Sequence, residues 1–486
     1  MTARILHGDC RDLLRTLPAE SVQCVVTSPP YWAQRNYRIP PTVWGGDLAC
    51  EHEWGDGLPL HRGGAVGSAG QTAGYQRGAN AARDATAQID AAAFCARCNA
   101  WRGCLGLEPD HRLFVAHVVE VFREVWRVLR PDGTLWLNLG DTYCGSRAQQ
   151  GRRAAALNRD KVPSGLKPKD LGGIPWRVAL ALQDDGWWLR RDIIWHKRSC
   201  MPESVTDRPT TAHEYLFLMT KGEDYFYDFL PLMEASSPNS HARAARGRGA
   251  GHKYADGGPG DQSLHRSKVS AGRVFAVPGV NPKAATEHGP GPRPKQNASF
   301  AAAMVEMVAM RNARSVWEIA LEPFSGAHFA TMPPELAERC MLAGMSEAGA
   351  CPHCGAPWGR MTIKGEVNSA HQRACGGNAT GGYLGQSVKG HVGAAGVQDA
   401  SEVKRRILAG MRETVTAGWR MTCACPYMRP VRCTVLDPFG GAGTTALAAD
   451  RLRHDAVLIE LSRDYIGMAE RRLEGDAGLF ARVTAA

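Results

Sequence analysis

A glycine-rich segment close to the end of the chain most narrows the folds that this sequence can adopt. Its sequence is DPFGGAGTT at 437–445, after a short apolar stretch at 434–436 and before a helical pattern that starts at 446. Glycines let the backbone approach a ligand closely, and the N-terminus of the following helix favours negative charge. This order of strand, glycine-rich loop and helix is typical of nucleotide-binding α/β domains.

Other stretches alternate between strand and helix patterns. We predict strands at 21–27, 134–139, 189–195, 215–219, 434–436 and 456–459. We predict helices at 114–129, 174–183, 333–343 and 446–452, and a turn at 130–133. Strands that alternate with helices indicate an α/β fold with a Rossmann-like, doubly wound and mostly parallel sheet.

Size, charge and cysteine content set further limits. The 486 residues are enough for more than one structural unit, and the net charge of +10 favours an anionic partner such as nucleic acid. The first eleven residues lack the apolar run of a signal peptide, and no stretch has the apolar length of a transmembrane helix. We therefore expect a cytoplasmic chain with no membrane partner. Its 15 cysteines then point to thiols or metal ligands rather than disulfides.

A second short segment, TSPPYW at 27–32, follows the predicted buried strand at 21–27. Together, TSPPYW and DPFGGAGTT resemble the paired motifs of the DNA amino-methyltransferases, the N4-cytosine and N6-adenine family. TSPPYW precedes DPFGGAGTT, which resembles the permuted order of the family's β group. The resemblance implies the methyltransferase form of the α/β sheet, S-adenosylmethionine as cofactor and double-stranded DNA as partner. It also implies a prokaryotic or phage-infected host and a cognate restriction endonuclease as a candidate partner.

The resemblance assigns catalysis to Ser28, Pro29, Pro30 and Tyr31. An exocyclic amine is a poor nucleophile, because its lone pair is delocalised into the ring. The Ser28 hydroxyl and the Pro29 carbonyl can each accept a hydrogen bond from one of the two N–H groups of the amine, and consecutive prolines keep these acceptors in place. The Tyr31 ring can stack on an extruded base. Cytosine-N4 enzymes of the family usually carry Ser-Pro-Pro-Tyr and adenine enzymes Asp-Pro-Pro-Tyr, so we expect cytosine N4, with adenine N6 as the alternative.

The resemblance also assigns a cofactor site and a target-base pocket. Asp437 would face the cofactor ammonium group, Glu460 the ribose hydroxyls and Asp9 the adenine amino group. Core packing is an equal alternative for Trp195. The expected cofactor-binding residues are Asp9, His328, Phe329, Asp437, Phe439, Gly441, Gly443, Thr444 and Glu460, and those of the target-base pocket are Trp32, Trp195 and Lys197.

Two groups of cysteine and histidine residues have the spacing of tetrahedral zinc sites. We predict one or two structural Zn²⁺ ions, because a four-ligand site leaves no open position for catalysis. The single residue inside two of the ligand pairs is a tighter spacing than usual, so His353 and Cys104 are alternative ligands, and reduced thiols without metal are the other reading. The two groups are Cys50, His52, Cys95 and Cys98, and Cys351, Cys354, Cys423 and Cys425.

Composition changes divide the chain into seven predicted parts. Residues 239–298 hold ten arginines and lysines against three acidic residues, which suits contacts with DNA phosphates or, alternatively, a flexible solvated loop. The parts are a first catalytic part at 1–48, a zinc-knuckle insertion at 49–104, a second catalytic part at 105–235, a basic target-recognition or DNA-contact segment at 236–312, a first cofactor part at 313–348, a second zinc-knuckle insertion at 349–430, and the cofactor loop with the C-terminal part at 431–486.

Three other functions compete with this interpretation. An RNA or protein amide methyltransferase would share the fold, but the family's RNA relatives tend to carry Asn-Pro-Pro and to place the cofactor loop first. An NAD-dependent oxidoreductase would fit the pattern G-x-G-x-x-A at 441–446, but nothing in the sequence marks a hydride-relay residue. A zinc-containing DNA-binding protein that has lost catalysis would not need an intact Ser28 and Tyr31.

Overall fold

The chain forms two compact units. The computed structural model describes residues 2–34, 37, 39–47, 49–54, 93–144, 165–200, 202–235, 310–322, 332–367, 412–477 and 482–485. The first unit comprises Met1–Leu232, Arg314–Gly359 and Trp419–Ala486, and the second comprises Met233–Ala313 and Arg360–Gly418. Every described residue of the predicted sites belongs to the first unit.

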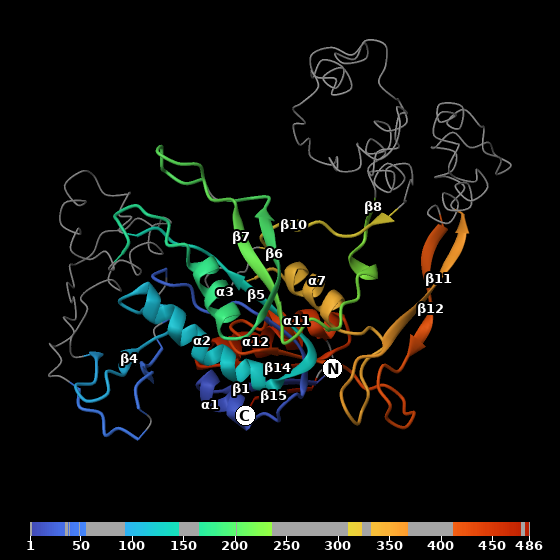
Figure 1. Cartoon of the computed structure of the whole chain (residues 1–486), viewed down its shortest axis with the longest axis horizontal. Helices are drawn as coiled ribbons and strands as arrows, with labels where there is room; N and C mark the ends of the chain where they lie inside the picture. The colour runs from blue at the N-terminus through green and yellow to red at the C-terminus, as the bar shows by residue number, and fades with distance from the viewer. Residues whose placement is uncertain are drawn as a thin grey trace, which may run out of the picture. The chain divides into compact units, whose positions relative to one another are not determined.

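A nine-stranded sheet forms the centre of the first unit (Figure 1). Within it, β7 runs antiparallel to both of its neighbours, and the other neighbouring strands pair in parallel. The prediction of a mostly parallel α/β sheet is therefore confirmed. In spatial order the strands are β10 (Val316–Ile319), β6 (Trp188–Lys197), β7 (His213–Thr220), β5 (Leu129–Leu139), β2 (Val22–Thr27), β13 (Thr434–Asp437), β14 (Asp455–Glu460), β1 (Thr2–His7) and β15 (Arg482–Ala485).

The pairing of β2 with β13 positions the two sequence motifs. Cys24 pairs with Val435 and Val25 with Leu436, and the two strands are parallel. Their carboxyl ends therefore lie at the same edge of the sheet, and each motif begins where its strand ends. Ligands of open α/β sheets bind outside the carboxyl ends of the strands.

Helices pack against the sheet in two groups. In the first group, α2 (His111–Val128) contacts both α1 (Cys10–Thr16) and α3 (Ile174–Asp184). In the second group, α11 (Thr444–Arg451) contacts both α7 (Pro334–Gly344) and α12 (Arg463–Ala477). Side chains of a strand alternate between the two faces of a sheet. Accordingly, Leu135 and Leu137 of β5 join the buried cluster that includes α2 and α3, while Trp136 lies beside Gly344 of α7.

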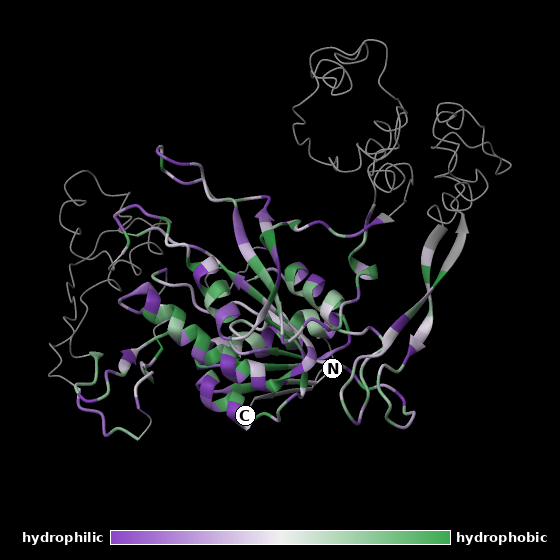
Figure 2. Ribbon diagram, in the orientation of Figure 1, coloured by the Kyte–Doolittle hydropathy of each residue, from purple (hydrophilic) through white to green (hydrophobic). Residues whose placement is uncertain are grey.

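The helix α2 shows how the sequence specifies one of these elements. Asp110 caps its N-terminus, where the carboxylate accepts a hydrogen bond from the backbone N–H of Arg112 at 2.7 Å. Phe114, Val118 and Val125 lie on its buried side, and Figure 2 shows polar residues on other parts of the same helix. The helix begins three residues before the predicted start, because the cap lies outside the apolar pattern.

Some local predictions were wrong or are only partly met. The predicted turn at 130–133 lies inside β5, at the point where its register against β2 shifts. Within the predicted zinc-knuckle insertion at 349–430, for which the sequence predicted no strand, β12 (Arg412–Arg420) pairs with β11 (Gly359–Val367). The basic segment 239–298 and nearly all of 55–93 lie outside the described residues.

Short elements complete the description. In the first unit β3 (Thr42–Trp44) pairs antiparallel with β4 (Trp101–Gly103), and η3 (Leu230–Leu232) is a single 3₁₀ turn. In the second unit β8 (Glu234–Ala235) pairs antiparallel with β9 (Met310–Arg311). None of the helices in the described ranges combines the length and the apolar character needed to cross a membrane.

The buried His454, which precedes β14, gives stability a testable pH dependence. Burial lowers the pKa of His454 to about 4, against 6.5 for an ordinary histidine. Between these values the unfolded chain binds the extra proton, so His454 adds stability above pH 6.5 and this contribution is lost as the pH falls to about 4. The contribution of His454 to the free energy of unfolding changes by on the order of 3 kcal/mol across this pH range. We expect His454→Gln to flatten the fall in unfolding free energy over this window.

Urea denaturation of the wild type and of His454→Gln at pH 4.5 and pH 7.5 measures this effect. The quantity to compare is the change in unfolding free energy between the two pH values, because it does not depend on any constant cost of the substitution. An equal change in both proteins would contradict the assignment.

Candidate active site

A cavity of about 330 Å³ lies at the carboxyl ends of β2, β13 and β14. Its walls include the segments that directly follow β1, β2, β13 and β14, so four distant parts of the sequence meet there. Its volume is typical of small-molecule sites. Members of the predicted catalytic, cofactor and target-base sets that line it are Asp9, Ser28, Pro29, Pro30, Tyr31, Lys197, Asp437, Phe439, Gly441, Thr444 and Glu460.

The glycine-rich loop turns sharply between β13 and α11. Gly441 and Gly443 have φ angles of 50° and 78°, in the left-handed region that favours glycine. A Cβ atom at Gly443 would also lie 2.9 Å from the Cβ of Ala469 on α12. A larger residue at 443 would therefore both strain the backbone and push α12 away from the loop.

The Asp437 side chain joins the two motif-bearing strands. Its Oδ1 accepts hydrogen bonds from the Thr27 hydroxyl at 2.6 Å and from the Phe439 backbone N–H at 3.0 Å, and its Oδ2 accepts one from the Thr445 hydroxyl at 2.7 Å. Burial raises the pKa of Asp437, and these three hydrogen bonds offset part of that rise. The carboxylate oxygens retain lone pairs that a ligand's donor could use.

Glu460 ends β14 on the wall of the same cavity. Its two carboxylate oxygens accept hydrogen bonds from the backbone N–H groups of Gly441 at 2.8 Å and Ser462 at 2.7 Å. Burial raises the pKa of Glu460 as well. The carboxyl groups of Asp437 and Glu460 thus both line the cavity. Each accepts its hydrogen bonds from neutral groups, which are hydroxyls or backbone amides.

Asp9 lies near this site at the start of α1. It caps that helix and forms an ion pair with Arg11, with 2.7 Å between Oδ2 and Nη2. Burial alone would raise the pKa of Asp9, but the hydrogen bonds and charge of Arg11 outweigh it and the pKa lies below its ordinary value. Asp9 is therefore ionised at neutral pH.

The predicted catalytic segment, residues 28–31, forms a polar network with the strands β5 and β7. The Tyr31 hydroxyl donates to Oε2 of Glu214 at 2.7 Å, and the Ser28 hydroxyl lies 3.3 Å from Oδ1 of Asn138. The Asn138 amide donates to Glu214 and to the Tyr215 carbonyl, which fixes its Oδ1 as the atom facing Ser28. The Ser28 hydroxyl also lies 3.2 Å from the Tyr31 hydroxyl, so it can donate its proton to Tyr31 or to Asn138, and in both cases Ser28 keeps lone pairs available to accept hydrogen bonds.

The Tyr31 ring is held in a narrow space. A Cβ atom at Gly140 would lie 2.5 Å from Cε2 of Tyr31, so the ring packs directly on this glycine. Burial and then the adjacent Glu214 carboxylate raise the pKa of Tyr31 well above its ordinary value. Tyr31 is therefore a neutral hydrogen-bond donor at physiological pH. Lys197 pairs with the other oxygen of Glu214 and balances its charge.

Two residues expected at the target-base pocket do not line the cavity. Trp195 is 2% exposed and donates from its indole N–H to the Ile319 carbonyl at 3.1 Å. Trp32 is 4% exposed and donates to the Glu108 carbonyl at 3.0 Å. Both indoles are thus core residues with satisfied N–H groups, and among the expected pocket residues Lys197 lines the cavity. His328 and Phe329 lie outside the described residues.

Sequence reasoning missed Asn138, Glu214 and Thr27. Each is a polar residue in a strand that is otherwise largely buried. Such a residue is a sign of a functional or positioning role, because burial of an unpaired polar group is costly. The partners of these residues could not be read from the sequence, since they depend on which strands are neighbours.

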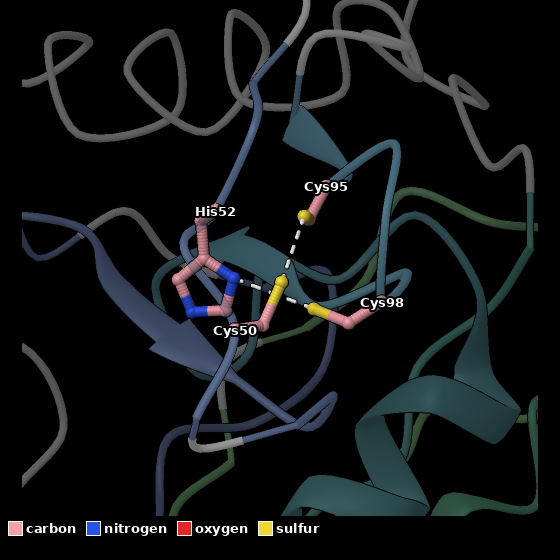
Figure 3. A group of neighbouring side chains, drawn as sticks. All are labelled: Cys50, His52, Cys95 and Cys98. Carbon is pink, nitrogen blue, oxygen red and sulfur yellow. Dashed lines mark hydrogen bonds between the residues drawn. The ribbon is translucent and has the colours of Figure 1, made fainter.

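The two predicted cysteine and histidine groups each come together in space. In each group the four candidate ligand atoms all lie within 4.8 Å of one another. Figure 3 shows the first group, in which the Cys50 and Cys95 sulfur atoms are 3.9 Å apart and the Cys98 sulfur lies 3.3 Å from Nδ1 of His52. The alternative ligands Cys104 and His353 belong to neither group. Both groups could hold a zinc ion.

Comparison with known proteins agrees with the family resemblance of the two sequence motifs. A family model described as DNA methylase, of the N6/N4 type, matches residues 22–351. The type II methyltransferase M.XycI of Xanthomonas campestris pv. cyanopsidis is 34% identical over 345 residues, which cover 70% of this chain and 71% of the relative. M.Cfr9I of Citrobacter freundii is 32% identical over 348 residues, covering 70% and 72%. Among solved structures, PvuII DNA methyltransferase aligns with 97% of this chain and 86% of its own at 12% identity, with a TM-score of only 0.40.

Proposed function

Because this chain belongs to the DNA methylase family, we propose that it transfers a methyl group from S-adenosylmethionine to N4 of cytosine in double-stranded DNA. The observation that carries the proposal is the position of Ser28. It follows β2 directly, next to the strand that bears the glycine-rich loop, and both motifs line one cavity. We place the reaction in the cytoplasm of a prokaryotic cell, with a cognate restriction endonuclease as an expected partner.

The cavity suits S-adenosylmethionine in its charges. This cofactor carries an ammonium and a sulfonium group. Burial raises the pKa of both Asp437 and Glu460, whose hydrogen-bond donors are neutral hydroxyl and backbone N–H groups. A bound cation would restore the favourable ionised form of such carboxyl groups. Asp437, Glu460, Asp9 and the backbone of the glycine-rich loop are the residues that would hold the cofactor. When bound, it supplies an electrophilic methyl group.

The residues of the catalytic segment would prepare the amine. The Ser28 hydroxyl and the Pro29 carbonyl each accept a hydrogen bond from one of its two N–H groups. These hydrogen bonds draw the nitrogen toward a pyramidal geometry and free its lone pair. Asn138 orients the Ser28 hydroxyl, and Glu214 holds the Tyr31 ring at the cavity. The acceptors are set before the substrate arrives, so little reorganisation is needed in the transition state.

The choice of cytosine over adenine rests on Ser28. The family resemblance associates serine at this position with cytosine N4 and aspartate with adenine N6. Both bases present an amine beside a ring nitrogen that accepts a hydrogen bond, so the network around Ser28 is compatible with either. N6-adenine methylation is therefore the alternative.

Base analysis of host DNA tests the proposal. The full chain is expressed in a host that lacks DNA amino-methylation, and the isolated DNA is hydrolysed and separated by liquid chromatography with mass spectrometry. We expect N4-methyldeoxycytidine, and none of it with Ser28→Ala expressed at the same level. N6-methyldeoxyadenosine alone would overturn the choice of base. If neither base is modified by a folded protein that binds S-adenosylmethionine, the proposed reaction is wrong.

A further inference from the structure

We propose that Cys50, His52, Cys95 and Cys98 bind a Zn²⁺ ion, and that this ion holds in place one wall of the cofactor cavity. The proposal goes beyond a structural zinc in general, because it gives the ion a specific effect on ligand binding. It rests on the proposed function only for the identity of the ligand in that cavity.

The distances within the group fit a tetrahedral ion. Zinc bonds of about 2.3 Å to sulfur and 2.0 Å to nitrogen place neighbouring ligand atoms roughly 3.5–3.8 Å apart. The separations of 3.9 Å for Cys50 and Cys95 and 3.3 Å for Cys98 and His52 lie close to these values (Figure 3). A disulfide would require sulfur atoms about 2.05 Å apart. Three thiolates and one imidazole are a ligand set that zinc prefers.

The backbone around the ligands is shaped for a small central ion. The Cys95 N–H donates to the Ala100 carbonyl at 2.8 Å and the Asn99 N–H donates to the Cys95 carbonyl at 2.9 Å, which closes a tight knuckle around Cys98. Gly46 has a φ of 73°, and a Cβ atom there would lie 2.8 Å from the Cys98 sulfur. A side chain at 46 would therefore displace a ligand.

Two segments far apart in the sequence meet at this group. More than forty residues separate His52 from Cys95. The backbone contacts between the two segments are an isolated bridge from Trp54 to Cys95 and a hydrogen bond from the Ala96 N–H to the Glu53 carbonyl at 2.8 Å. The side-chain contacts include exposed ion pairs of Arg97 with Glu51 and Glu53, which contribute little to stability. The Arg102 guanidinium also lies over the Trp54 ring. A metal ion bound by both segments offsets the entropic cost of closing the loop between them with the free energy of metal binding, as in small zinc domains.

The knuckle continues directly into the short β3–β4 pair. Trp44 of β3 pairs with Trp101 of β4, and both indoles stack on His117 of α2 with ring centroids 5.0 and 5.5 Å away. The guanidinium of Arg11 lies 3.7 Å above the Trp44 ring. Thr42 and Trp44 line the cavity itself, so β3 is part of its wall, and Cys104 and Leu105 directly after β4 line it as well.

The segment after β4, residues 104–108, connects the β3–β4 pair to the residues that follow Tyr31. Nδ1 of His117 lies 3.1 Å from the buried Glu108 carboxylate, which also accepts the Gly106 N–H at 2.8 Å. The Gly106 carbonyl in turn accepts the Ala33 N–H at 2.8 Å, two residues after Tyr31. The Trp32 indole donates to the Glu108 carbonyl. Loss of the ion would thus loosen the cavity wall and the support of the catalytic segment.

The second cysteine group offers a matched control within the same chain. The Gln23 amide donates to the Gly355 carbonyl at 2.9 Å, and its Oε1 accepts the Thr434 N–H at 2.7 Å. Gln23 and Thr434 lie near the amino ends of β2 and β13, at the edge of the sheet opposite the cavity. None of Cys351, Cys354, Cys423 and Cys425 lines the cavity.

Zinc content and cofactor affinity together test the proposal. The full chain, Cys98→Ser and Cys354→Ser are purified, and zinc is measured by elemental analysis. The dissociation constant for S-adenosylmethionine is measured by calorimetry, and folding is checked by circular dichroism. We expect Cys98→Ser to hold one zinc fewer than the wild type and to bind S-adenosylmethionine about tenfold more weakly. Cys354→Ser should keep its affinity within about twofold.

A conservative variant covers the case in which Cys98→Ser fails to fold. His52→Cys keeps four zinc ligands and should retain both the ion and the affinity, whereas His52→Ala should lose both. Unchanged zinc content in Cys98→Ser or His52→Ala would overturn the metal site. Equal loss of affinity in Cys98→Ser and Cys354→Ser would overturn the role of the ion in the cavity wall. A wild type that holds zinc and does not bind S-adenosylmethionine would instead refute the proposed function.

Discussion

Replacement of Ser28 by alanine should lower the rate of DNA methylation by about 10²–10³-fold, the usual cost of removing one preorganised hydrogen-bond partner of a transition state. In the proposed reaction the Ser28 oxygen accepts a hydrogen bond from one N–H group of the target amine. The Tyr31 hydroxyl lies 3.2 Å from this oxygen, but it is held by its own hydrogen bond to Glu214. The affinity for S-adenosylmethionine should stay within about twofold, because the glycine-rich loop, Asp437 and Glu460 do not depend on Ser28. Single-turnover methylation and calorimetry measure the two quantities.

The matched control is Ser28→Thr, which keeps the hydroxyl and adds one methyl group. It should retain more activity than Ser28→Ala if the oxygen is what matters. Equal loss of activity in both variants would indicate a steric role for this position. Loss of cofactor binding in Ser28→Ala would mean that the roles of the two motif loops have been misassigned.

Replacement of Asp437 by asparagine should weaken the binding of S-adenosylmethionine by at least about tenfold, through the loss of a charge-assisted contact with the cofactor ammonium group. The fold should tolerate this change. Asparagine has nearly the same shape, and the hydroxyls of Thr27 and Thr445 can rotate to accept as well as to donate hydrogen bonds. Removal of a buried charge offsets part of any hydrogen bond that is lost, so the free energy of unfolding should change by about 1 kcal/mol or less.

The control for this experiment is Thr445→Val, which removes one hydrogen bond to Asp437 and leaves its charge in place. It should lower stability by about 1–2 kcal/mol with a smaller effect on affinity than Asp437→Asn. Calorimetry and urea denaturation separate the two effects. If Asp437→Asn lowers stability and leaves the affinity unchanged, Asp437 only joins the strands and does not contact the cofactor.

The sequence predicted the elements of this fold better than their arrangement. The apolar pattern placed the helix α3 and the strands β13 and β14 within about two residues of their observed bounds. Burial of one helix face imposes a regular spacing, and a strand buried on both faces gives a short continuous apolar run. The antiparallel direction of β7 could not be predicted in the same way. A strand buried on both faces has the same apolar pattern in either direction.

The candidate site was predictable only where its residues are consecutive. Ser28 and Asp437 stand in short motifs, so their roles could be expected from the sequence. Asn138 and Glu214 come together because β5 and β7 are neighbours in the sheet, and no local pattern carries that information. Trp195 was expected at the target-base pocket from the family resemblance, with core packing as an equal alternative, and it shares the buried side of β6 with Ile193.

The pairing of β2 with β13 has a consequence for the synthesis of this protein. Ser28 is translated more than 400 residues before its neighbouring strand and the residues that follow that strand, up to Thr445. A nascent or prematurely terminated chain that stops between them therefore has the proposed catalytic serine without the adjoining half of the cavity. We expect such a product to be unable to modify DNA, so that activity begins only after Thr445 has been translated.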